Sequence, residues 1–406
     1  MKLRYTNILR TLVVALVALF SASCGVSEER MHTLKVYNWG DYIDEELLTE
    51  FEEWYEEQTG CPVKVVYQTF DINEVMLAKI EKGEADFDVV CPSEYIIERM
   101  MRHDILEPIM TDEFRADLES TGTENYIEKY ISPYILNQFG HIIAPEGHDP
   151  RDYSVGYMWG TTGILYNPKY ITDEEADSWG IIWDERLESK VLMKDAYRDI
   201  YGCMIMYARY QELLDGKVTR QQLMNDTSDE AIAAVEELLK SAKRNIAGWE
   251  VDFGKEMMTK EKAWLNLTWS GDAVWAIEEA AAVDVELDYT VPEEGSIVWF
   301  DGWVIPRYAK NKKAAVYFID FMCKPENAIR NMEEIGYVSV ISSPEILAYV
   351  EESAEEAGFE EALDLSYFFE GADSVVANPV LYHDRSVIER CAMMHDSGAR
   401  TEQLLE

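Results

Sequence analysis

Short apolar runs alternate with amphipathic stretches in the part of the chain that follows residue 33. In the first amphipathic stretch, Leu47, Phe51 and Trp54 recur with helical spacing, and Gly60 follows the last periodic residues. This alternation predicts a mostly parallel sheet whose ligand-facing loops lie at the carboxyl ends of its strands. The pattern predicts strands at 34–37, 62–68 and 87–91, alternating with helices that begin near Asp44, at Asn73 and after Ser93.

The second half of the chain repeats the alternation after one long strand, at 153–167, which glycines interrupt. The sequence contains no internal repeat and no low-complexity linker. We therefore expect two α/β lobes between which the chain crosses twice, near 153–163 and near 297–305. The other predicted elements are helices at about 199–210, 228–243, 273–282, 312–322 and 325–334, strands at 263–269 and 297–306, and a turn at 270–272.

The second crossing segment, Ile297–Pro306, is a run of strand-forming residues with one carboxylate among aromatic side chains. Apart from Asp301 and Gly302 the run is apolar, which predicts a strand that is buried on both faces. A buried carboxylate is costly unless it is paired, and no Lys or Arg lies between Lys262 and Arg307. A protonated amine would suit this place, because the carboxylate and the neighbouring rings both attract a cation. The alternative is that Asp301 caps a turn with Gly302 and that the aromatic residues belong to the core.

Aromatic residues stand next to polar groups at several other predicted strand ends. Each case has a second explanation, since single Trp and Tyr residues are often core residues and carboxylates in a first helical turn are favoured by the helix dipole. Their recurrence at ligand-facing positions in both predicted lobes favours a shared binding site. The segments are Trp39–Tyr42, Ser93–Tyr95, Trp269–Asp272 and Trp299–Asp301, with Asp195–Asp199 at the start of a helix.

The chain begins with a segment that is typical of a secretory signal. Three basic residues precede an apolar run at 11–20, and small residues lead to Cys24. The run is too short to span a bilayer as a mature helix. Its end is similar to a bacterial lipobox, with Ser21 where Leu is usual. We expect residues 1–24 to contain a lipoprotein signal peptide and Cys24 to carry the lipid.

The composition is strongly acidic. The chain has 36 Lys and Arg residues against 78 Asp and Glu residues, and removal of the three basic residues of the leader changes the formal net charge from −42 to −45. This balance argues against a nucleic-acid partner, because affinity for nucleic acid comes from Lys and Arg that neutralise phosphates. A cationic ligand fits better, since an acidic surface raises the local concentration of cations, although net charge also serves solubility alone.

The cysteines and histidines predict neither a disulfide framework nor a metal centre. Of the six Cys residues, the five besides Cys24 are an odd number without a C-x-x-C pair, so at least one thiol stays free. The six His residues are scattered, which gives a zinc site no local support. The chain also lacks G-x-S-x-G, H-E-x-x-H and P-loop segments. We expect no metal and no cofactor.

Six short segments carry a resemblance to a known family: Val36–Ile43, Asp88–Ser93, Tyr157–Gly163, Trp269–Asp272, Trp299–Asp301 and Ile335–Tyr337. In this order they resemble the motifs of bacterial periplasmic spermidine/putrescine-binding proteins, and the resemblance covers essentially the whole mature chain. It implies an α/β protein with the two-lobed, type II periplasmic binding protein fold, each lobe a mostly parallel sheet flanked by helices, with two hinge crossovers.

The resemblance also implies how the chain is divided and with what it interacts. Lobe 1 would comprise residues 33–155 and 303–345, and lobe 2 residues 156–302 and 346–406. The lobes would close over a small cationic polyamine and deliver it to the permease of an inner-membrane ABC importer. The protein would be a monomer in the periplasm, anchored to the membrane through its lipid.

The same resemblance implies a ligand site in which aromatic rings sandwich the methylene chain while carboxylates bind the ammonium groups. Asp301 and Asp199 would be the principal anchors. The residues that match polyamine-contacting positions are Trp39, Tyr42, Ser93, Tyr95, Asp199, Trp269, Asp272, Trp299, Asp301 and Tyr337, to which Asp41 is added from putrescine-type members.

A few positions bear on the choice of polyamine. Asp41 and Asp272 resemble putrescine-type members, whereas Tyr95 resembles spermidine-type members. Ala196 stands where spermidine-type members carry a second acid, which Asp195 could replace by a one-residue shift. We expect a diamine ligand or a mixed specificity.

Two other functions are open at this point. A receptor that reports polyamine to a membrane signalling protein would use the same closed lobes as a transport protein. A lipoprotein hydrolase would use two of Asp199, Asp272 and Asp301 as acid and base, but no catalytic motif supports it. We therefore expect a binding protein without catalytic activity.

Overall fold

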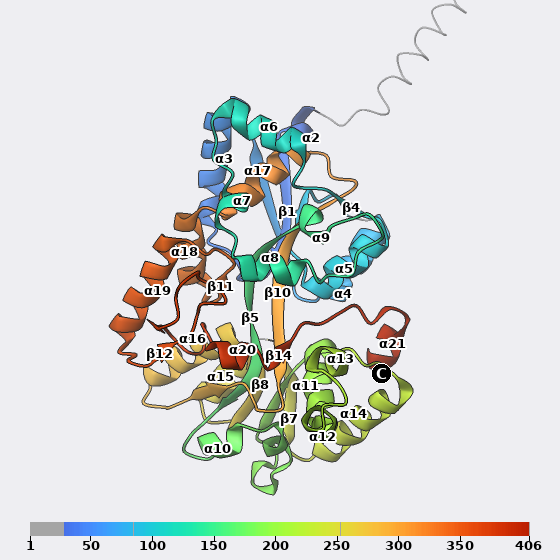
Figure 1. Cartoon of the computed structure of the whole chain (residues 1–406), viewed down its shortest axis with the longest axis vertical. Coiled ribbons are helices and arrows are strands. Elements are labelled where there is room, and N and C mark those ends of the chain that lie inside the picture. Colours follow the sequence, from blue (N-terminus) through green and yellow to red (C-terminus); the bar gives the residue numbers. More distant parts are fainter. Residues whose placement is uncertain (1–27, 84, 252, 406) are drawn as a thin grey trace, which may run out of the picture.

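The computed structural model describes residues 28–83, 85–251 and 253–405. Two groups of helices and strands lie at opposite ends of the molecule, and the long strands β5 (Ser154–Tyr166) and β10 (Ser296–Pro306) run between them (Figure 1). Every residue of both strands is buried, as their apolar sequence predicts. The two strands pair antiparallel, with Trp299 opposite Gly160. The expected α/β architecture with two lobes is confirmed.

The first group is built around β1, which pairs in parallel with β2 and β3. Leu47 and Phe51 of α3 are buried in its core, and the Phe51 ring packs edge-on against Phe318 of α17 with centroids 5.2 Å apart. The elements are α2 (Glu28–Met31), β1 (Thr33–Trp39), α3 (Glu46–Thr59), β2 (Lys64–Phe70), α4 (Asn73–Glu81), β3 (Val89–Val90), α5 (Glu94–Arg102), β4 (Leu106–Glu107), α6 (Asp112–Thr121), α7 (Tyr126–Tyr130), α8 (Pro133–Phe139), α9 (Pro150–Tyr153) and α17 (Lys312–Met322).

The second group is built around β6, which pairs in parallel with β7 and β8. Its elements are α10 (Asp173–Ala176), η1 (Trp179–Trp183), η2 (Glu185–Leu187), β6 (Val191–Lys194), α11 (Tyr197–Ala208), α12 (Tyr210–Leu214), α13 (Arg220–Met224), α14 (Asp229–Ala242), β7 (Ile246–Glu250), α15 (Gly254–Thr259), β8 (Leu265–Trp269), α16 (Ser270–Ala281) and β9 (Asp288–Thr290).

One continuous sheet passes through both groups. Within the described residues its central strand order is β2-β1-β3-β10-β5-β8-β6-β7. The sheet is parallel at its two ends, but β10 is antiparallel to both β3 and β5, and β5 is antiparallel to β8. This middle part departs from a purely parallel arrangement because β5 and β10 carry the chain between the groups in opposite directions. The lobe boundaries given by residue number stay a prediction.

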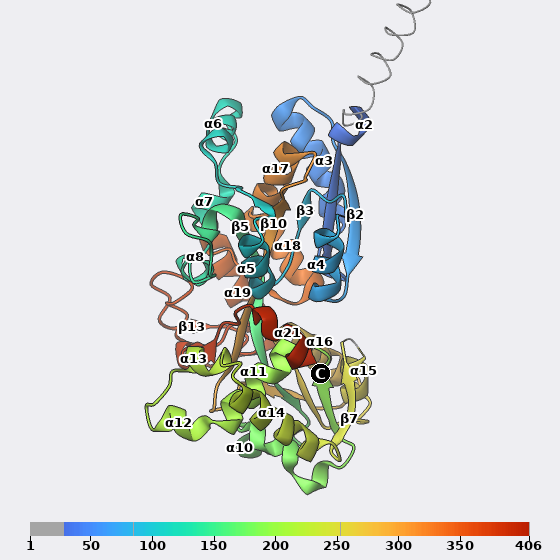
Figure 2. The same ribbon diagram turned by 90° about the vertical axis from the view of Figure 1, so that its right-hand side faces the viewer.

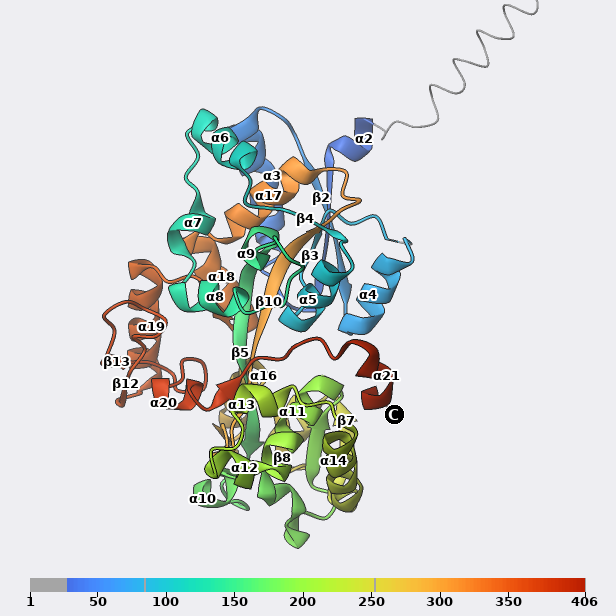
Figure 3. The ribbon, with the colours of Figure 1, turned by 45° about the vertical axis from the view of Figure 1, so that its right-hand side comes forward.

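The end of the chain lies across both groups (Figures 2 and 3). Arg99 of α5 donates to the Thr401 hydroxyl at 2.6 Å and pairs with Asp396 at 2.9 Å, while the Asn225 amide donates to the Met393 carbonyl at 3.0 Å. The remaining elements are α18 (Pro325–Ile335), β11 (Val338–Ser339), α19 (Pro344–Ala357), β12 (Ala362–Leu363), β13 (Val375–Val376), α20 (Arg385–Ile388), β14 (Cys391–Ala392), η3 (Gly398–Arg400) and α21 (Thr401–Leu405).

One local prediction is corrected. Residues 270–272 form the first turn of α16 instead of a separate turn, with Trp269 at the N-cap, so Asp272 lies at a helix N-terminus where its charge is favoured. The predicted start of a helix after Ser93 is confirmed, and Ser93 occupies the N-cap of α5, although its side chain makes no capping hydrogen bond. Its hydroxyl is used elsewhere, as described below.

Several expectations concern thiols and the membrane. The five Cys residues from Cys61 onward are all free. The predicted signal peptide and Cys24 lie outside the described residues. Across the described ranges, no helix is both long enough and apolar enough to cross a membrane.

Candidate functional site

Asp301 lies in the middle of β10, where the pairing with β5 shifts register between Asp301 and Gly302. Such a bulge changes the direction in which a side chain points. The Asp301 carboxylate is 6% exposed and accepts two hydrogen bonds, from the Ser93 hydroxyl at 2.6 Å and from the Tyr42 hydroxyl at 2.9 Å. Burial raises the pKa of Asp301 to about 7, although both hydrogen bonds act to lower it. Among the described residues, the donors that hold this carboxylate are neutral.

A second row of polar side chains lies behind Ser93, one of the two donors. The Asn73 amide donates to the Ser93 hydroxyl at 3.0 Å and to the Tyr95 hydroxyl at 3.2 Å, and Tyr95 in turn donates to Glu74 at 2.9 Å. Burial raises the pKa of Tyr42 well above its usual range, so its hydroxyl keeps the proton that it donates to Asp301. The Ser93 hydroxyl thus donates to the Asp301 carboxylate and does not cap α5.

Asp199 lies in the first turn of α11 and is also buried. Its Oδ1 atom accepts hydrogen bonds from the Thr162 hydroxyl at 2.8 Å and from the Trp269 indole N–H at 2.9 Å. Burial raises the pKa of Asp199, against the hydrogen bonds from Trp269 and Thr162 and the charges of Lys194 and Arg198. Like Asp301, this carboxylate is hydrogen-bonded by neutral groups.

Asp272 is treated differently. Lys194 places its ammonium 2.6 Å from one carboxylate oxygen, and Lys255 lies 3.5 Å from the other. The Tyr337 hydroxyl donates to the same carboxylate at 3.2 Å. Burial alone would raise the pKa of Asp272, but the charges of the two lysines hold it below its usual range.

Aromatic rings connect the three carboxylates. The Tyr337 ring contacts the rings of Tyr42 and Trp299 edge-on, each with centroids 5.5 Å apart. Two glycines make room for these rings. A Cβ atom on Gly160 would lie 2.6 Å from the Trp299 ring, and a Cβ atom on Gly271 would lie 2.5 Å from the Tyr337 ring. The Trp269 indole donates to Asp199 and turns its ring face toward Lys194, whose ammonium is 4.3 Å from the ring centroid.

Most of the predicted site residues therefore belong to one network of contacts. It runs from Asp301 through Tyr42 and Tyr337 to Asp272, and from there through Lys194 to Trp269 and Asp199. Two members of the predicted set lie differently. Asp41 is exposed in the turn after β1, with a φ angle of 50°. Trp39 packs against Phe70 with ring centroids 4.6 Å apart. Asp195, the proposed replacement for the missing acid at Ala196, is exposed.

Three side chains that shape the network were not predicted from the sequence. Thr162 and Asn73 hydrogen-bond site residues, and Lys194 neutralises Asp272. A signal existed for Lys194, because a lysine at the carboxyl end of the apolar strand β6 has to find a partner when it is buried. Thr162 lay within a segment of the family resemblance, but nothing distinguished it from its neighbour Thr161.

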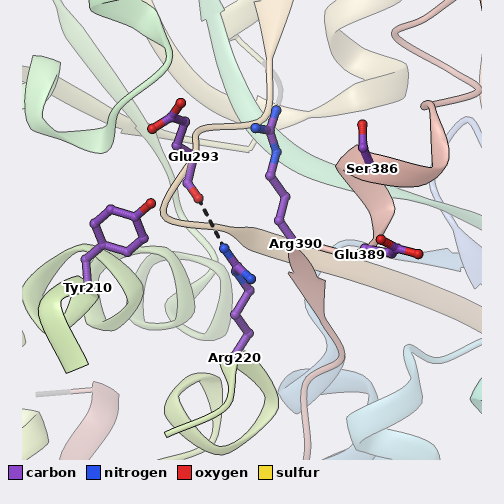
Figure 4. A pocket seen from close by; sticks show the side chains of 6 residues that line it. All are labelled: Tyr210, Arg220, Glu293, Ser386, Glu389 and Arg390. Carbon is purple, nitrogen blue, oxygen red and sulfur yellow. Dashed lines mark hydrogen bonds between the residues drawn. The ribbon is translucent and has the colours of Figure 1, made fainter. Parts of the chain in front are cut away.

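A hollow of about 470 Å³ lies elsewhere, on the second group of elements (Figure 4). Arg220 crosses it to donate to the backbone carbonyls of Glu293 and Glu294, both at 3.4 Å. Its lining mixes the acidic side chains of Glu293 and Glu389 with the basic side chains of Arg220 and Arg390. The hollow contains none of the predicted site residues: it is lined by Tyr210, Arg220, Glu293, Ser386, Glu389 and Arg390.

Comparison with known proteins agrees with this geometry. The profile of the bacterial extracellular solute-binding proteins matches residues 47–354. The chain belongs to this family. This solute-binding protein is 29% identical over 307 residues to the spermidine/putrescine-binding periplasmic protein of Salmonella typhimurium. The aligned region covers 75% of this chain and 76% of that protein. It is 28% identical over 351 residues to the putrescine-binding periplasmic protein PotF of Escherichia coli, with coverages of 83% and 86%.

Solved structures of other binding proteins superpose on this chain. The spermidine/putrescine ABC transporter substrate-binding protein PotD of Streptococcus pneumoniae superposes with a TM-score of 0.62 and 28% identity, over 92% of this chain and 95% of that one. The TpPotD lipoprotein of Treponema pallidum superposes with a TM-score of 0.67 at 23% identity, over 92% and 97% of the two chains, which is a likeness of fold. The two-lobed binding-protein fold of this solute-binding protein is thereby confirmed.

Proposed function

We propose that this chain is an extracytoplasmic polyamine-binding protein that delivers its ligand to an ABC importer and catalyses no reaction. The observation that carries the proposal is the pair of buried carboxylates, Asp301 and Asp199, which are held by neutral donors beside aromatic rings. Burying an anion without a counterion is costly. A ligand ammonium would supply the missing charge at each position. The names of the relatives, which are spermidine/putrescine-binding and putrescine-binding proteins, support the same ligand class.

In this proposal the two ends of the ligand bind to opposite parts of the fold. Asp301, with Ser93 and Tyr42, would bind one ammonium group, and Asp199, with Thr162, would bind the other. The rings of Trp269, Trp299 and Tyr337 would contact the methylene groups between them, because such rings offer a large apolar face at low entropic cost. The proposed set also includes Trp39, Asp41, Tyr95 and Asp272, of which Asp272 lines the site as the partner of Lys194.

Ligand would also hold the lobes together. Ser93 and Tyr42 come from the first group of elements, whereas Asp199 and Trp269 come from the second. An amine that bridges them favours a closed form, and the paired strands β5 and β10 are where hinge bending would occur. We infer that the closed form is the one an ABC permease accepts.

The proposal includes the location of the protein. A lipid on Cys24 would anchor the chain to a membrane as a monomeric periplasmic lipoprotein. Replacement of Cys24 by Ala should release the protein from washed membranes into the soluble fraction. Retention of the variant in the membrane fraction would contradict the anchor.

The test of function is isothermal titration of the purified protein with putrescine, cadaverine, spermidine and spermine. A neutral sugar serves as the control ligand. We expect one-to-one binding of at least one amine and no heat from the sugar. Absence of heat with every amine, from protein shown to be folded by circular dichroism, would overturn the proposed ligand class.

A further inference from the structure

A lysine of the chain itself lies inside the candidate site. Lys194, the last residue of β6, is 1% exposed. Its ammonium donates to Asp272 at 2.6 Å, to the Val251 carbonyl at 2.6 Å and to Glu250 at 3.2 Å. These contacts use all three of its N–H groups. The same ammonium lies 4.3 Å from the centre of the Trp269 ring.

These surroundings would also bind a ligand ammonium, because they offer a carboxylate, further oxygen acceptors and the face of an indole ring. Lys194 already occupies them. Glu250 is satisfied as well, since it also accepts hydrogen bonds from the Gly254 backbone at 3.0 Å and from the Asn266 amide at 3.1 Å. The position beside Trp269 therefore holds a cation before any ligand arrives.

The carboxylates of the site differ in what lies beside them. Lys194 and Lys255 lie against Asp272, and Lys194 also lies against Glu250, so both of these carboxylates have a cation beside them. Asp301 and Asp199 are hydrogen-bonded by neutral donors, and among the described residues neither forms an ion pair, although the charges of Lys194 and Arg198 act on Asp199. These two carboxylates match a ligand that carries two ammonium groups. A third ammonium beside Trp269 would have to displace Lys194.

We propose that Lys194 is a built-in ammonium that occupies one amine position of the site and thereby selects diamines over triamines and tetramines. The inference rests on the proposed function and specifies its ligand class. Lys194 is a specificity-determining residue that need not contact the ligand. It acts by keeping Asp272 and the face of Trp269 occupied.

The experiment compares putrescine and spermidine by isothermal titration of the wild type and of Lys194→Met. Met keeps most of the apolar stem and removes the charge. We expect the wild type to prefer putrescine, and the ratio of spermidine to putrescine affinity to rise about tenfold or more in the variant, which corresponds to about 1.4 kcal/mol. Adding Asp272→Asn to Lys194→Met should cancel that gain, because the freed carboxylate is then gone.

Two further variants keep the test decisive. Lys194→Met leaves Glu250 buried without its ammonium, so Lys194→Met/Glu250→Gln is made in parallel and used if the single variant does not fold. Lys190→Met is the matched control, since the Lys190 ammonium lies over another indole, that of Trp264, at 4.7 Å outside the site. It should leave the ratio of the two affinities unchanged.

The outcomes distinguish a failure of the proposed function from a failure of the role proposed for Lys194. A wild type that binds neither amine contradicts the proposed function. A wild type that binds spermidine more tightly than putrescine, or folded variants in which the ratio does not change, leaves the proposed function intact and overturns the role of Lys194.

Discussion

Asp301 and Asp272 are two buried aspartates at opposite ends of one aromatic cluster, and the fold treats them in opposite ways. They are 6% and 9% exposed, and both connect to Tyr337, Asp272 directly and Asp301 through Tyr42. Asp272 is paired with Lys194, whereas Asp301 receives only hydroxyl groups. Burial alone therefore does not make a cation site. The better candidate for binding a ligand cation is the carboxylate that the fold positions but does not neutralise.

A third aspartate shows the limit of that rule. Asp320 of α17 is 0% exposed, and burial raises its pKa to about 7, as for Asp301. One of its oxygens accepts from the Ile127 backbone at 3.0 Å, in the core of the first group. A raised pKa therefore accompanies both a structural and a candidate ligand-binding carboxylate, and only the surroundings distinguish them.

The largest expected effect comes from Asp301→Asn. The change removes one charge and keeps the side-chain shape, so the ligand ammonium would be buried without its counterion. We expect a loss of amine affinity on the order of 2–5 kcal/mol. Isothermal titration measures the loss, and thermal unfolding of the unliganded variant should show no loss of stability, because an unpaired buried charge has been removed.

Asp320→Asn is the matched control for that variant. It neutralises an equally buried aspartate with a similarly raised pKa, outside the aromatic cluster. It should change thermal stability without changing amine affinity. Equal losses of affinity in the two variants would mean that Asp301 acts through general electrostatics or folding, and the comparison between the carboxylates would fail.

The next effect is a dependence of amine affinity on pH. Because burial raises the pKa of Asp301 to about 7, the unliganded carboxyl is partly protonated near neutral pH. The ligand ammonium favours the ionised form, so binding should expel this proton. Below pH 7 we expect affinity to fall about tenfold for each pH unit, with a further contribution from Asp199, whose pKa is also raised.

Titrations at pH 5.5 and 7.5, in buffers that differ in ionisation enthalpy, would count the protons released. Release should be found at the lower pH and should decrease in Asp301→Asn. The stability of the unliganded protein should change in the opposite direction to the affinity, since it should fall as the pH rises. A carboxyl with a raised pKa binds its proton more tightly in the folded state, so its contribution to stability is present at low pH and is lost as pH rises through about 7. Affinity that does not vary over this pH range would contradict a raised pKa at the binding carboxylate.

Local rules single out Asp301, because the run around it is an apolar strand with a single charge and a buried charge is costly. Asp199 opens a helix after a strand, which local rules also explain without a ligand, so its role as an anchor came from the family resemblance. The binding role of both stays a prediction. The chain order of most helices and strands also followed from periodicity. Ser270–Asp272 was misassigned because Ser and Gly favour turns, and the contacts of α16 with the rest of the fold decide otherwise.

The contacts across the fold could not be predicted in the same way. Lys194 and Asp272 are 78 positions apart, and Asn73 reaches Ser93 from another helix. Nothing in a single sequence states which buried lysine meets which buried aspartate. Asp41 was included in the predicted site because it resembles putrescine-type members of the family. Its side chain is exposed in the structure, which a single sequence could not show.

A smaller effect is expected from Gly160→Ala, which perturbs the aromatic cluster and not the charges. The added methyl group would lie 2.6 Å from both the Trp299 ring and the Ser270 hydroxyl, so the indole must move. We expect a cost of about 1–3 kcal/mol in stability and a weaker but detectable affinity for amines. Gly248→Ala is the control, because its methyl group would meet Phe253 at an ordinary distance of 3.6 Å. An unchanged affinity in Gly160→Ala would show that the position of Trp299 is not important for binding.

The smallest effect should come from Asp41→Asn. Asp41 has a φ angle of 50°, a conformation that Asn also adopts readily, so the substitution tests the charge without straining the turn. An exposed carboxylate attracts a cation mainly over a distance and is screened by salt. We expect affinity to change by about threefold or less, with the association rate lowered at low ionic strength only. Stopped-flow measurements at two salt concentrations would separate these terms. A loss as large as that of Asp301→Asn, at both salt concentrations, would mean that Asp41 turns inward and contacts the amine when the lobes close, and that a carboxylate outside the buried network also binds the ligand.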